Sequence, residues 1–303
     1  MERTSWIHEL TKIEGRPVIF DGAMGSLLMA GGLKPGAVPD MLCVEKPELV
    51  KGAHKSYVDA GADVIHTNTF GSNRIRLSQA GGSKDVPLLN RAAAKLAREV
   101  IEASGESRTR ALAAGDVGPS GKLLKPLGEL SPEEAHEAFL EQVQSLAEAR
   151  VDFISIETMF SLKEALLALE AAKDACSLPV SVSMTYEKRK NGFFTVMGET
   201  PRSCVEALSA GGADMVGANC TLASADMREL ALELVAASQL PVLIEPNAGQ
   251  PVARGGSVEY LEDPAFFAAN VAPLASEGVT AMGGCCGTTP EHIRELRRVV
   301  TGK

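Results

Sequence analysis

Short apolar segments rich in β-branched residues recur along the chain, and each is followed by a longer segment with helical periodicity. Within the short segments the apolar residues are nearly continuous and do not alternate with polar ones. This pattern is typical of strands buried on both faces, as in a parallel sheet. The predicted strands lie at residues 18–21, 62–67, 110–115, 151–156, 178–184, 213–218, 240–244 and 279–283.

The stretches between the predicted strands carry the start and stop signals of helices. A Ser or Thr stands at the expected cap, with Pro or Glu in the turn that follows, at Ser131, Ser161 and Thr289. A glycine stands where a helix should end before the next strand at Gly61, Gly211 and Gly278. The pattern therefore predicts strands and helices in regular alternation.

Eight successive βα units indicate an α/β protein with a (β/α)8 TIM barrel, and we expect one domain over residues 1–303. A doubly wound sheet is disfavoured, because the first predicted strand leads into Asp21-Gly22-Ala23-Met24-Gly25, which lacks the dinucleotide fingerprint. The stretch from Gly25 to Pro47 is poor in strand signals. It is predicted to be a long loop above the first strand.

Composition and charge narrow the classes of partner. The chain has 303 residues, a net charge of −9 and 4% aromatic residues, which disfavours both nucleic acid and anionic membrane surfaces as partners. The amino-terminal residues do not read as a secretory signal, and no window approaches 18 uninterrupted apolar residues. We therefore expect a cytoplasmic protein without a membrane span.

Three of the six cysteines follow predicted strands, at the end of a barrel where active sites lie. Cys220 closes the sixth strand, and Cys285 and Cys286 close the eighth. Three converging thiolates suit zinc and leave a fourth position open. Both neighbouring cysteines could reach one metal only if the chain turns there, which the surrounding glycines permit. Inert burial is the alternative for cysteines in general. It is the preferred interpretation of Cys43, Cys176 and Cys204.

Two other polar residues near predicted strand ends receive no catalytic role. His66 is taken as a histidine whose hydrogen bonds are satisfied within the protein and not as a ligand, and Glu245 is left unassigned.

The order of several motifs resembles the homocysteine S-methyltransferase family. The motifs are Asp21-Gly22-Ala23-Met24-Gly25, Thr67-Asn68-Thr69-Phe70, Gly115-Asp116-Val117-Gly118-Pro119, Glu157-Thr158, Asn219-Cys220 and the segment from Gly283 to Pro290. The last segment, Gly-Gly-Cys-Cys-Gly-Thr-Thr-Pro, is highly specific when an Asn-Cys pair precedes it. The resemblance runs from about Pro17 to Val300 and implies a zinc-bearing (β/α)8 barrel.

The resemblance implies one catalytic Zn²⁺ held by Cys220, Cys285 and Cys286, with the open position taken by the thiolate of homocysteine. Zinc would ionise that thiol and keep its sulfur nucleophilic toward an electrophilic methyl group, so that methionine forms. By the same resemblance, the backbone N–H groups of Gly22 and Ala23 would receive the substrate carboxylate. Glu157 would receive the ammonium, and Asp21 would orient the set. Asn219 could offer an oxygen to the metal when no substrate is bound.

The methyl donor is predicted from departures within the family pattern. Gly71 stands where betaine-dependent members resembling this chain carry a tyrosine, and Gly287 stands where S-methylmethionine-dependent members carry arginine. With Gly118, these glycines predict a broad mouth without an aromatic cage, which favours a methylcorrinoid donor. No Asp-x-His-x-x-Gly segment occurs, so the corrinoid is expected on a separate protein or cobalamin domain. Alternatives are another thiol acceptor, betaine or S-methylmethionine as donor, and a non-catalytic zinc-thiol barrel.

Overall fold

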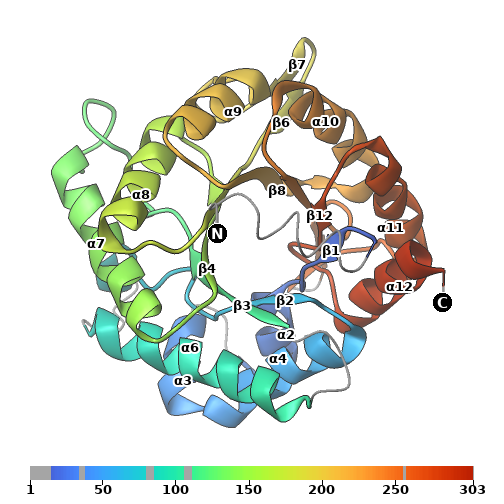
Figure 1. Ribbon diagram of the computed structural model, residues 1–303, viewed down its shortest axis with the longest axis horizontal. Helices are drawn as coiled ribbons and strands as arrows, with labels where there is room; N and C mark the ends of the chain where they lie inside the picture. Colours follow the sequence, from blue (N-terminus) through green and yellow to red (C-terminus); the bar gives the residue numbers. More distant parts are fainter. Residues whose placement is uncertain (1–14, 34–37, 80–84, 106–110, 255–256, 303) are drawn as a thin grey trace.

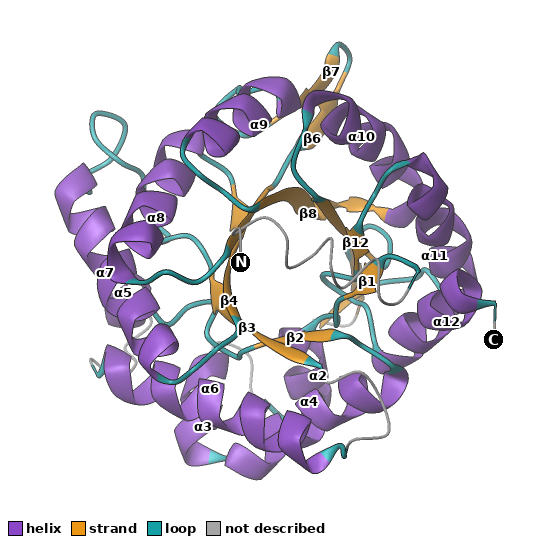
Figure 2. Cartoon of the chain, viewed as in Figure 1, coloured by secondary structure: helices purple, strands orange, loops and turns teal. Residues whose placement is uncertain are grey.

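The barrel seen in Figures 1 and 2 is built from eight parallel strands, in a computed structural model that describes residues 15–33, 38–79, 85–105, 111–254 and 257–302. The strands pair in the order β1-β12-β9-β8-β5-β4-β3-β2, and a bridge between Phe20 and Val64 closes the ring between β1 and β2. Their bounds are β1 (Val18–Ile19), β2 (Val64–His66), β3 (Leu112–Val117), β4 (Phe153–Met159), β5 (Val180–Met184), β8 (Met215–Ala223), β9 (Val242–Asn247) and β12 (Ala281–Met282). The predicted TIM barrel is thereby confirmed.

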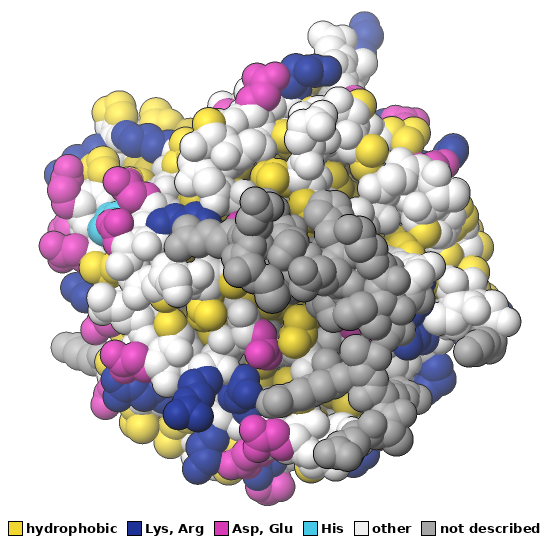
Figure 3. Space-filling model, viewed as in Figure 1, with side chains coloured by type: hydrophobic (Ala, Val, Ile, Leu, Met, Phe, Trp, Pro, Cys, Tyr) yellow, Lys and Arg dark blue, Asp and Glu magenta, His cyan; other side chains and the backbone are white. Residues whose placement is uncertain are grey.

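Helices form a ring around the strands, and charged side chains of both signs lie mainly over them, at the periphery of the face shown in Figure 3. The helices are α2 (Met24–Ala30), α3 (Leu42–Glu45), α4 (Pro47–Ala60), α5 (Arg74–Gln79), α6 (Val86–Ala103), α7 (Pro132–Glu148), α8 (Leu162–Ala175), α9 (Pro201–Ala210), α10 (Ser224–Ala237), α11 (Pro264–Val271) and α12 (Pro290–Thr301), with 3₁₀ turns η1 (Pro39–Met41) and η2 (Ala272–Glu277). Two hairpins complete the described chain, β6 (Glu187–Arg189) with β7 (Gly192–Phe194), and β10 (Val252–Arg254) with β11 (Ser257–Glu259). Among the described residues, no helix combines the length and apolar composition that crossing a bilayer requires.

The interior of the barrel is divided into an apolar layer and a polar layer. The apolar layer consists of Val18, Phe20, Val64, Ala114, Phe153, Met215, Leu243 and Ala281. Side chains two residues apart on a strand point to the same face, so the next inward position lies one layer higher. In β2, β3, β4 and β9 that position is polar and buried, at His66, Asp116, Ser155 and Glu245. Polar chemistry is thus concentrated at the carboxyl ends of the strands.

The predicted helix starts are confirmed, with one difference in detail. Ser131 and Thr289 cap α7 and α12 in reciprocal capping boxes. Ser161 caps α8 by accepting from the N–H of Glu164, but the Glu164 carboxylate accepts a hydrogen bond from the Ser120 N–H, 2.8 Å away. This buried glutamate therefore ties the β3–α7 loop to α8 rather than completing a capping box.

The prediction of a long loop from Gly25 to Pro47 is wrong for the residues that the structure describes. Helix α2 covers Met24–Ala30, and η1 and α3 occupy Pro39–Glu45, while residues 34–37 lie outside the described part. Leu28 of α2 packs in an apolar cluster with Leu42 of α3 and Val50 of α4. Burial of these side chains stabilises helix despite the neighbouring glycines, because tertiary packing overrides weak local propensity.

A repeated polar contact ties neighbouring strands together at their amino-terminal ends. A side chain just before each of four strands accepts a hydrogen bond from a backbone N–H of the preceding barrel strand. The pairs are Asp63 with Ile19, Asp152 with Ala113, Asp214 with Val180, and Thr280 with Val242, at 2.8–2.9 Å. Two residues earlier the chain has a left-handed conformation each time, at Gly61, Arg150, Gly212 and Gly278. At the third junction this residue is Gly212 and not the predicted Gly211, whose φ is −72°.

Arg150 is the only non-glycine residue at these four left-handed positions, with φ of 64°. A non-glycine residue in this region costs roughly 1–2 kcal/mol, partly offset by the greater unfolded-state entropy of glycine. We therefore predict that Arg150→Gly raises the free energy of unfolding by about 0.5–1 kcal/mol, measured by chemical denaturation. Gly61→Ala, at φ of 99°, is the reciprocal control and should destabilise the protein. A lower unfolding free energy for Arg150→Gly would contradict this account of the junctions.

Candidate active site

The three cysteines predicted to hold a metal converge at the carboxyl ends of the strands. Cys220 lies within β8, and Cys285 and Cys286 follow β12. Their sulfur atoms all lie within 4.8 Å of one another, and the Sγ atoms of Cys220 and Cys286 are 3.8 Å apart. The structure therefore brings together thiols that are 65 residues apart in the chain, from Cys220 to Cys285. It leaves Cys43, Cys176 and Cys204 outside the cluster.

A tight turn allows the two adjacent cysteines to share one site. The N–H of Thr288 donates to the carbonyl of Cys285 at 3.1 Å, and Gly287 between them has φ of 81°. The N–H of Cys285 donates to the carbonyl of Pro246 at 2.8 Å, which fixes the turn against the end of β9. The chain bends as the glycines predict, so both thiols reach the same cluster.

The other arm of the cluster has an unusual backbone. Cys220 and Thr221 have φ of 61° and 62°, and the pairing of β8 with β9 shifts register between Asn219 and Ala223. Left-handed conformations are uncommon for non-glycine residues and genuine outliers for β-branched ones such as Thr221. The Thr221 hydroxyl shares a hydrogen bond with the hydroxyl of Thr185 in β5's following turn. This irregularity turns the Cys220 thiol toward the other two.

The cluster has the chemistry and dimensions of a soft metal site. Tetrahedral geometry with metal–sulfur bonds of about 2.3 Å places two sulfurs about 3.8 Å apart, the separation observed for Cys220 and Cys286. Hydrogen bonds from Cys220 and Cys285 lower the pKa of Cys286, while hydrogen bonding with the other two thiols raises the pKa of Cys285. The three thiols thus oppose one another's ionisation, and a bound cation would allow all three to ionise.

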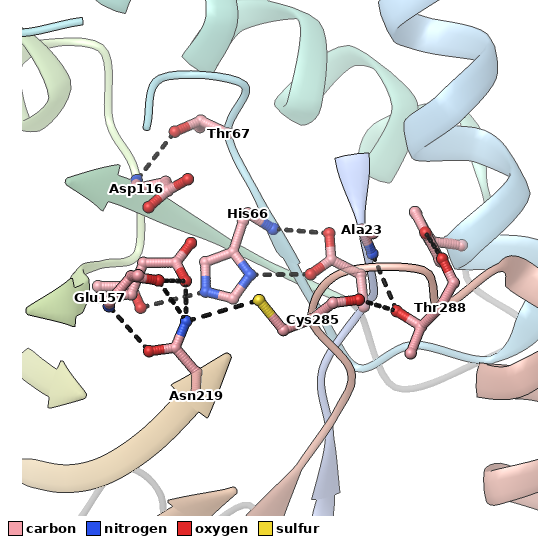
Figure 4. Close-up of polar contacts among 12 residues, drawn as sticks. Ala23, His66, Thr67, Asp116, Glu157, Asn219, Cys285 and Thr288 are labelled. Atoms are coloured by element: carbon pink, nitrogen blue, oxygen red, sulfur yellow. Dashed lines mark hydrogen bonds and ion pairs between the residues drawn. The ribbon is translucent and has the colours of Figure 1, made fainter. Parts of the chain in front are cut away.

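Asn219 joins the thiol cluster to a carboxylate. Its amide nitrogen donates to the Glu157 carboxylate, to the Thr158 hydroxyl at 2.7 Å and toward the Cys285 sulfur at 3.8 Å (Figure 4). Its amide oxygen accepts from the N–H of Thr158 at 2.8 Å. The oxygen expected to face a metal therefore faces β4 instead, and the amide nitrogen faces the cysteine.

Asp21, Gly22 and Ala23 lie beside this group at the end of β1. The hydroxyl of Thr288 accepts from the Ala23 N–H at 3.1 Å and donates to the Cys285 carbonyl at 2.7 Å. A Cβ on Gly22 would lie 2.5 Å from that hydroxyl, so only glycine fits without displacing Thr288. The Asp-Gly-Ala segment is thereby connected to the cysteine turn.

Sequence reasoning missed how many buried acids share this layer. Burial raises the pKa of Glu245 to about 8, and burial and the charge of Glu157 raise the pKa of Asp116. One Asp116 carboxylate oxygen has no hydrogen-bond partner among the described residues. His66, set aside from the sequence, contacts Asp21 and Ser155 through its ring nitrogens. Side chains alternate between the two faces of a strand, so His66 and Glu245, two residues after Val64 and Leu243, could have been predicted to lie inside the barrel.

The prediction that the barrel mouth is open and free of aromatic rings is wrong beside two of its glycines, Gly118 and Gly287. A Cβ on Gly118 would lie 2.5 Å from the ring of Phe70, and one on Gly287 would lie 2.2 Å from Tyr260. These glycines accommodate aromatic rings and do not leave empty space. The Phe70 ring also lies under the Arg76 guanidinium, 5.2 Å from the ring centre. Glycine in a sequence indicates where another group approaches as often as where nothing does.

Comparison of the sequence with known proteins identifies a family and two similar relatives. The sequence model of the homocysteine S-methyltransferase family matches residues 18–300. The methionine synthases of Mycobacterium tuberculosis and Mycobacterium leprae are each 30% identical over 303 residues. The match covers 96% of this chain but 25% of those proteins, so the chain spans about a quarter of their length.

Solved structures share the barrel. The metallated form of the homocysteine methyltransferase MmuM from Escherichia coli matches with a TM-score of 0.80 at 23% identity, over 96% of this chain and 99% of that one. Its apo form matches with a TM-score of 0.73 at 24% identity, over 94% and 96%. At this identity the likeness establishes the fold.

The close approach at Gly22 generates a prediction with a matched control. We expect Gly22→Ala to lower the free energy of unfolding by about 1–3 kcal/mol, because the added methyl group must displace the Thr288 hydroxyl. Gly25→Ala adds the same group where nothing lies within 4 Å, in helix α2, and should be neutral or stabilise by up to about 1 kcal/mol. Chemical denaturation measures both. Equal stability of the two variants would show that Thr288 moves without cost.

Proposed function

Since this chain belongs to the homocysteine S-methyltransferase family, we propose that it transfers a methyl group to the thiol of homocysteine and forms methionine. One observation carries the proposal. The Asn219 amide nitrogen bonds to the Glu157 carboxylate and also lies 3.8 Å from the Cys285 sulfur. On this proposal Cys285 belongs to the site for the thiol and Glu157 to the site for the ammonium group, and Asn219 joins them at the spacing that an amino acid with a thiol end requires.

We infer that the metal is zinc, held by Cys220, Cys285 and Cys286. Three cysteine sulfurs with a fourth position open are a typical zinc donor set, and the 3.8 Å sulfur separation fits it. When bound, zinc supplies the Lewis acidity that keeps a substrate thiol deprotonated and nucleophilic near neutral pH. The turn at Gly287 and the bend at Cys220 hold the three sulfurs in place for that purpose.

The chain's own residues would bind the other end of the substrate. Glu157 and Asp21 would supply carboxylates for the ammonium group, since Asp21 contacts His66 of the polar layer and Glu157 lies two residues beyond Ser155 of that layer. The N–H groups of Gly22 and Ala23 are proposed to receive the substrate carboxylate. Since the Ala23 N–H donates to Thr288 in this structure, that hydroxyl would have to share or release it. Fixed at both ends, the substrate sulfur would face the mouth of the barrel.

We propose a methylcorrinoid as the donor, presented by a separate protein or by a cobalamin domain. Support comes from the similarity to two methionine synthases, of which this chain matches about a quarter. Gly118 and Gly287 do not provide an open mouth for a corrinoid, because Phe70 and Tyr260 occupy the space beside them. Betaine and S-methylmethionine are the competing donors.

The zinc proposal predicts the metal content of the purified protein. Wild type should contain about one zinc per chain, and Cys220→Ala, Cys285→Ala and Cys286→Ala should each lose most of it, because three ligands define the site. Cys176→Ala is the matched control, since that thiol bonds to the Ala172 carbonyl at the end of α8 and lies outside the cluster. Elemental analysis after dialysis measures the content. Stoichiometric zinc in all three variants would refute the site.

The function proposal predicts a donor and acceptor preference. We expect zinc-loaded protein to convert homocysteine to methionine with methylcobalamin, free or on a corrinoid protein, and to give little product with betaine or S-methylmethionine. Product analysis by mass spectrometry with homocysteine and cysteine as acceptors measures both preferences. Efficient betaine turnover with inert methylcobalamin would overturn the donor, and a preference for cysteine would overturn the acceptor. Zinc binding without turnover of any pair would indicate a non-catalytic thiol-binding barrel.

A further inference from the structure

The Asp21 carboxylate is held by one residue through both of its oxygen atoms. The His66 ring nitrogen Nδ1 lies 2.8 Å from Asp21 Oδ1, and the His66 backbone N–H donates to Oδ2 at 2.9 Å. In Figure 4 the His66 ring lies at the centre of the site, between Glu157 and Asn219 on one side and Ala23 and Thr288 on the other. The orientation of Asp21 therefore depends on His66.

His66 is itself fixed on its remaining sides. Its Nε2 lies 3.1 Å from the Ser155 hydroxyl of β4, and its ring packs against Phe20, with 5.5 Å between the ring centres. These contacts come from Phe20 and Asp21, which follow β1, and from Ser155 of β4, so the imidazole cannot turn without breaking a contact to a neighbouring segment of the barrel. A side chain held in this way can fix a neighbour to the accuracy that substrate positioning requires.

We propose that His66 is a positioning residue of the ammonium subsite, which aims the Asp21 carboxylate at the amino group of the substrate. The proposal rests on the proposed binding of homocysteine. Each carboxylate oxygen can accept more than one hydrogen bond, so Asp21 can bind His66 and an ammonium group together. His66 acts through Asp21 and does not itself contact the substrate.

The charges around the ring agree with this role. Burial lowers the pKa of His66, but the charge and hydrogen bond of Asp21, with the charges of Glu245 and Glu157, raise it well above its usual range. An imidazolium donates from both ring nitrogens, which suits Asp21 on one side and Ser155 on the other. The direction of this shift favours the imidazolium, which would place a positive charge beside the buried carboxyl groups of this layer.

A second buried histidine provides the contrast that a test needs. His54 of α4 is fully buried, and neither of its ring nitrogens has a hydrogen-bond partner among the described residues. Burial lowers its pKa to about 4, so it is neutral near pH 7. His54 therefore resembles His66 in burial but makes no hydrogen bond to Asp21, whose charge only partly offsets the effect of burial on the pKa of His54. His54→Leu tests the effect of losing a nearby buried imidazole that has no hydrogen bond to Asp21.

The experiment compares two ligands of zinc-loaded protein by calorimetry, homocysteine and 4-mercaptobutanoate, which has the same thiol and carboxylate but no ammonium group. His66→Gln places an amide near Nε2 and loses the donor to Asp21, so homocysteine should bind about tenfold more weakly, as expected for a hydrogen bond to a charged group. 4-Mercaptobutanoate should bind within about twofold of wild type. His66→Asn keeps a donor near Nδ1 and should recover part of the loss, and His54→Leu should leave both affinities within about twofold.

A double-mutant cycle tests whether His66 acts through Asp21. Asp21→Asn should weaken homocysteine binding, and adding His66→Gln to it should cost little more, because residues in one network are not additive. Additive losses of homocysteine affinity in the double variant would overturn the proposal. It would also be overturned if His66→Gln weakened the binding of both ligands equally, or if His54→Leu lost as much homocysteine affinity as His66→Gln. A wild-type protein that binds 4-mercaptobutanoate as tightly as homocysteine would refute the ammonium subsite, and with it both proposals. If wild type prefers homocysteine to 4-mercaptobutanoate and His66→Gln shows the same preference, the role of His66 is refuted while the ammonium subsite stands.

Discussion

The pairing of Phe20 with Val64 closes the barrel, and the candidate active site depends on that closure. β1 pairs with β12 on one side, and on the other this bridge and the contacts between Asp63 and Ile19 join it to β2. The residue after Phe20 is Asp21, and the inward residue two positions after Val64 is His66, so the bridge sets the register in which the two side chains meet. A shift of one residue would turn His66 to the outer face of the barrel, because side chains alternate with a period of two. The bridge that closes the fold therefore also sets the register of the contact between His66 and the Asp21 carboxylate.

Closure also explains how the barrel tolerates so many buried polar groups. Burying an unpaired charge is unfavourable, and in the polar layer hydrogen bonds between neighbouring strands offset that desolvation. Asn219 of β8 bonds to Glu157 and Thr158 of β4, and His66 of β2 bonds to Asp21 beyond β1. Left-handed backbone at Thr158 and Cys220 adds strain of about 1–3 kcal/mol per residue, which persists only where surrounding contacts over-determine the chain. The strained positions lie where the acid and thiol groups meet, so the same contacts that stabilise the layer hold the site in shape.

Sequence patterns predicted the barrel and the cysteine cluster because both depend on signals that are local or repeated. Continuous apolar segments mark strands buried on both faces, and the glycines around Cys285 and Cys286 mark a turn. The helix α2 was missed because its stability comes from packing of Leu28 on distant segments, which no local pattern records. The rings beside Gly118 and Gly287 were missed for a similar reason, since a glycine does not indicate what fills the space next to it. His66 was judged alone, although its position two residues after a barrel-facing valine carried the information.

Asn219 links the thiol cluster to the Glu157 carboxylate, which we propose binds the substrate ammonium group, and this link would have a consequence for specificity. Asn219 contacts Glu157 and approaches Cys285, and its own oxygen is bound to the backbone of β4, so neither end can move independently. If the proposed function holds, a substrate would therefore span a set length between its sulfur and its amino group. Cysteine is shorter than homocysteine by one methylene, and a hydrophobic contact of that size discriminates by only about 1–3 kcal/mol. A buried carboxylate left without its ammonium partner costs more, because the charge remains desolvated. Selection of homocysteine would then come from the rigid spacing of two polar ends, more than from the fit of the chain between them.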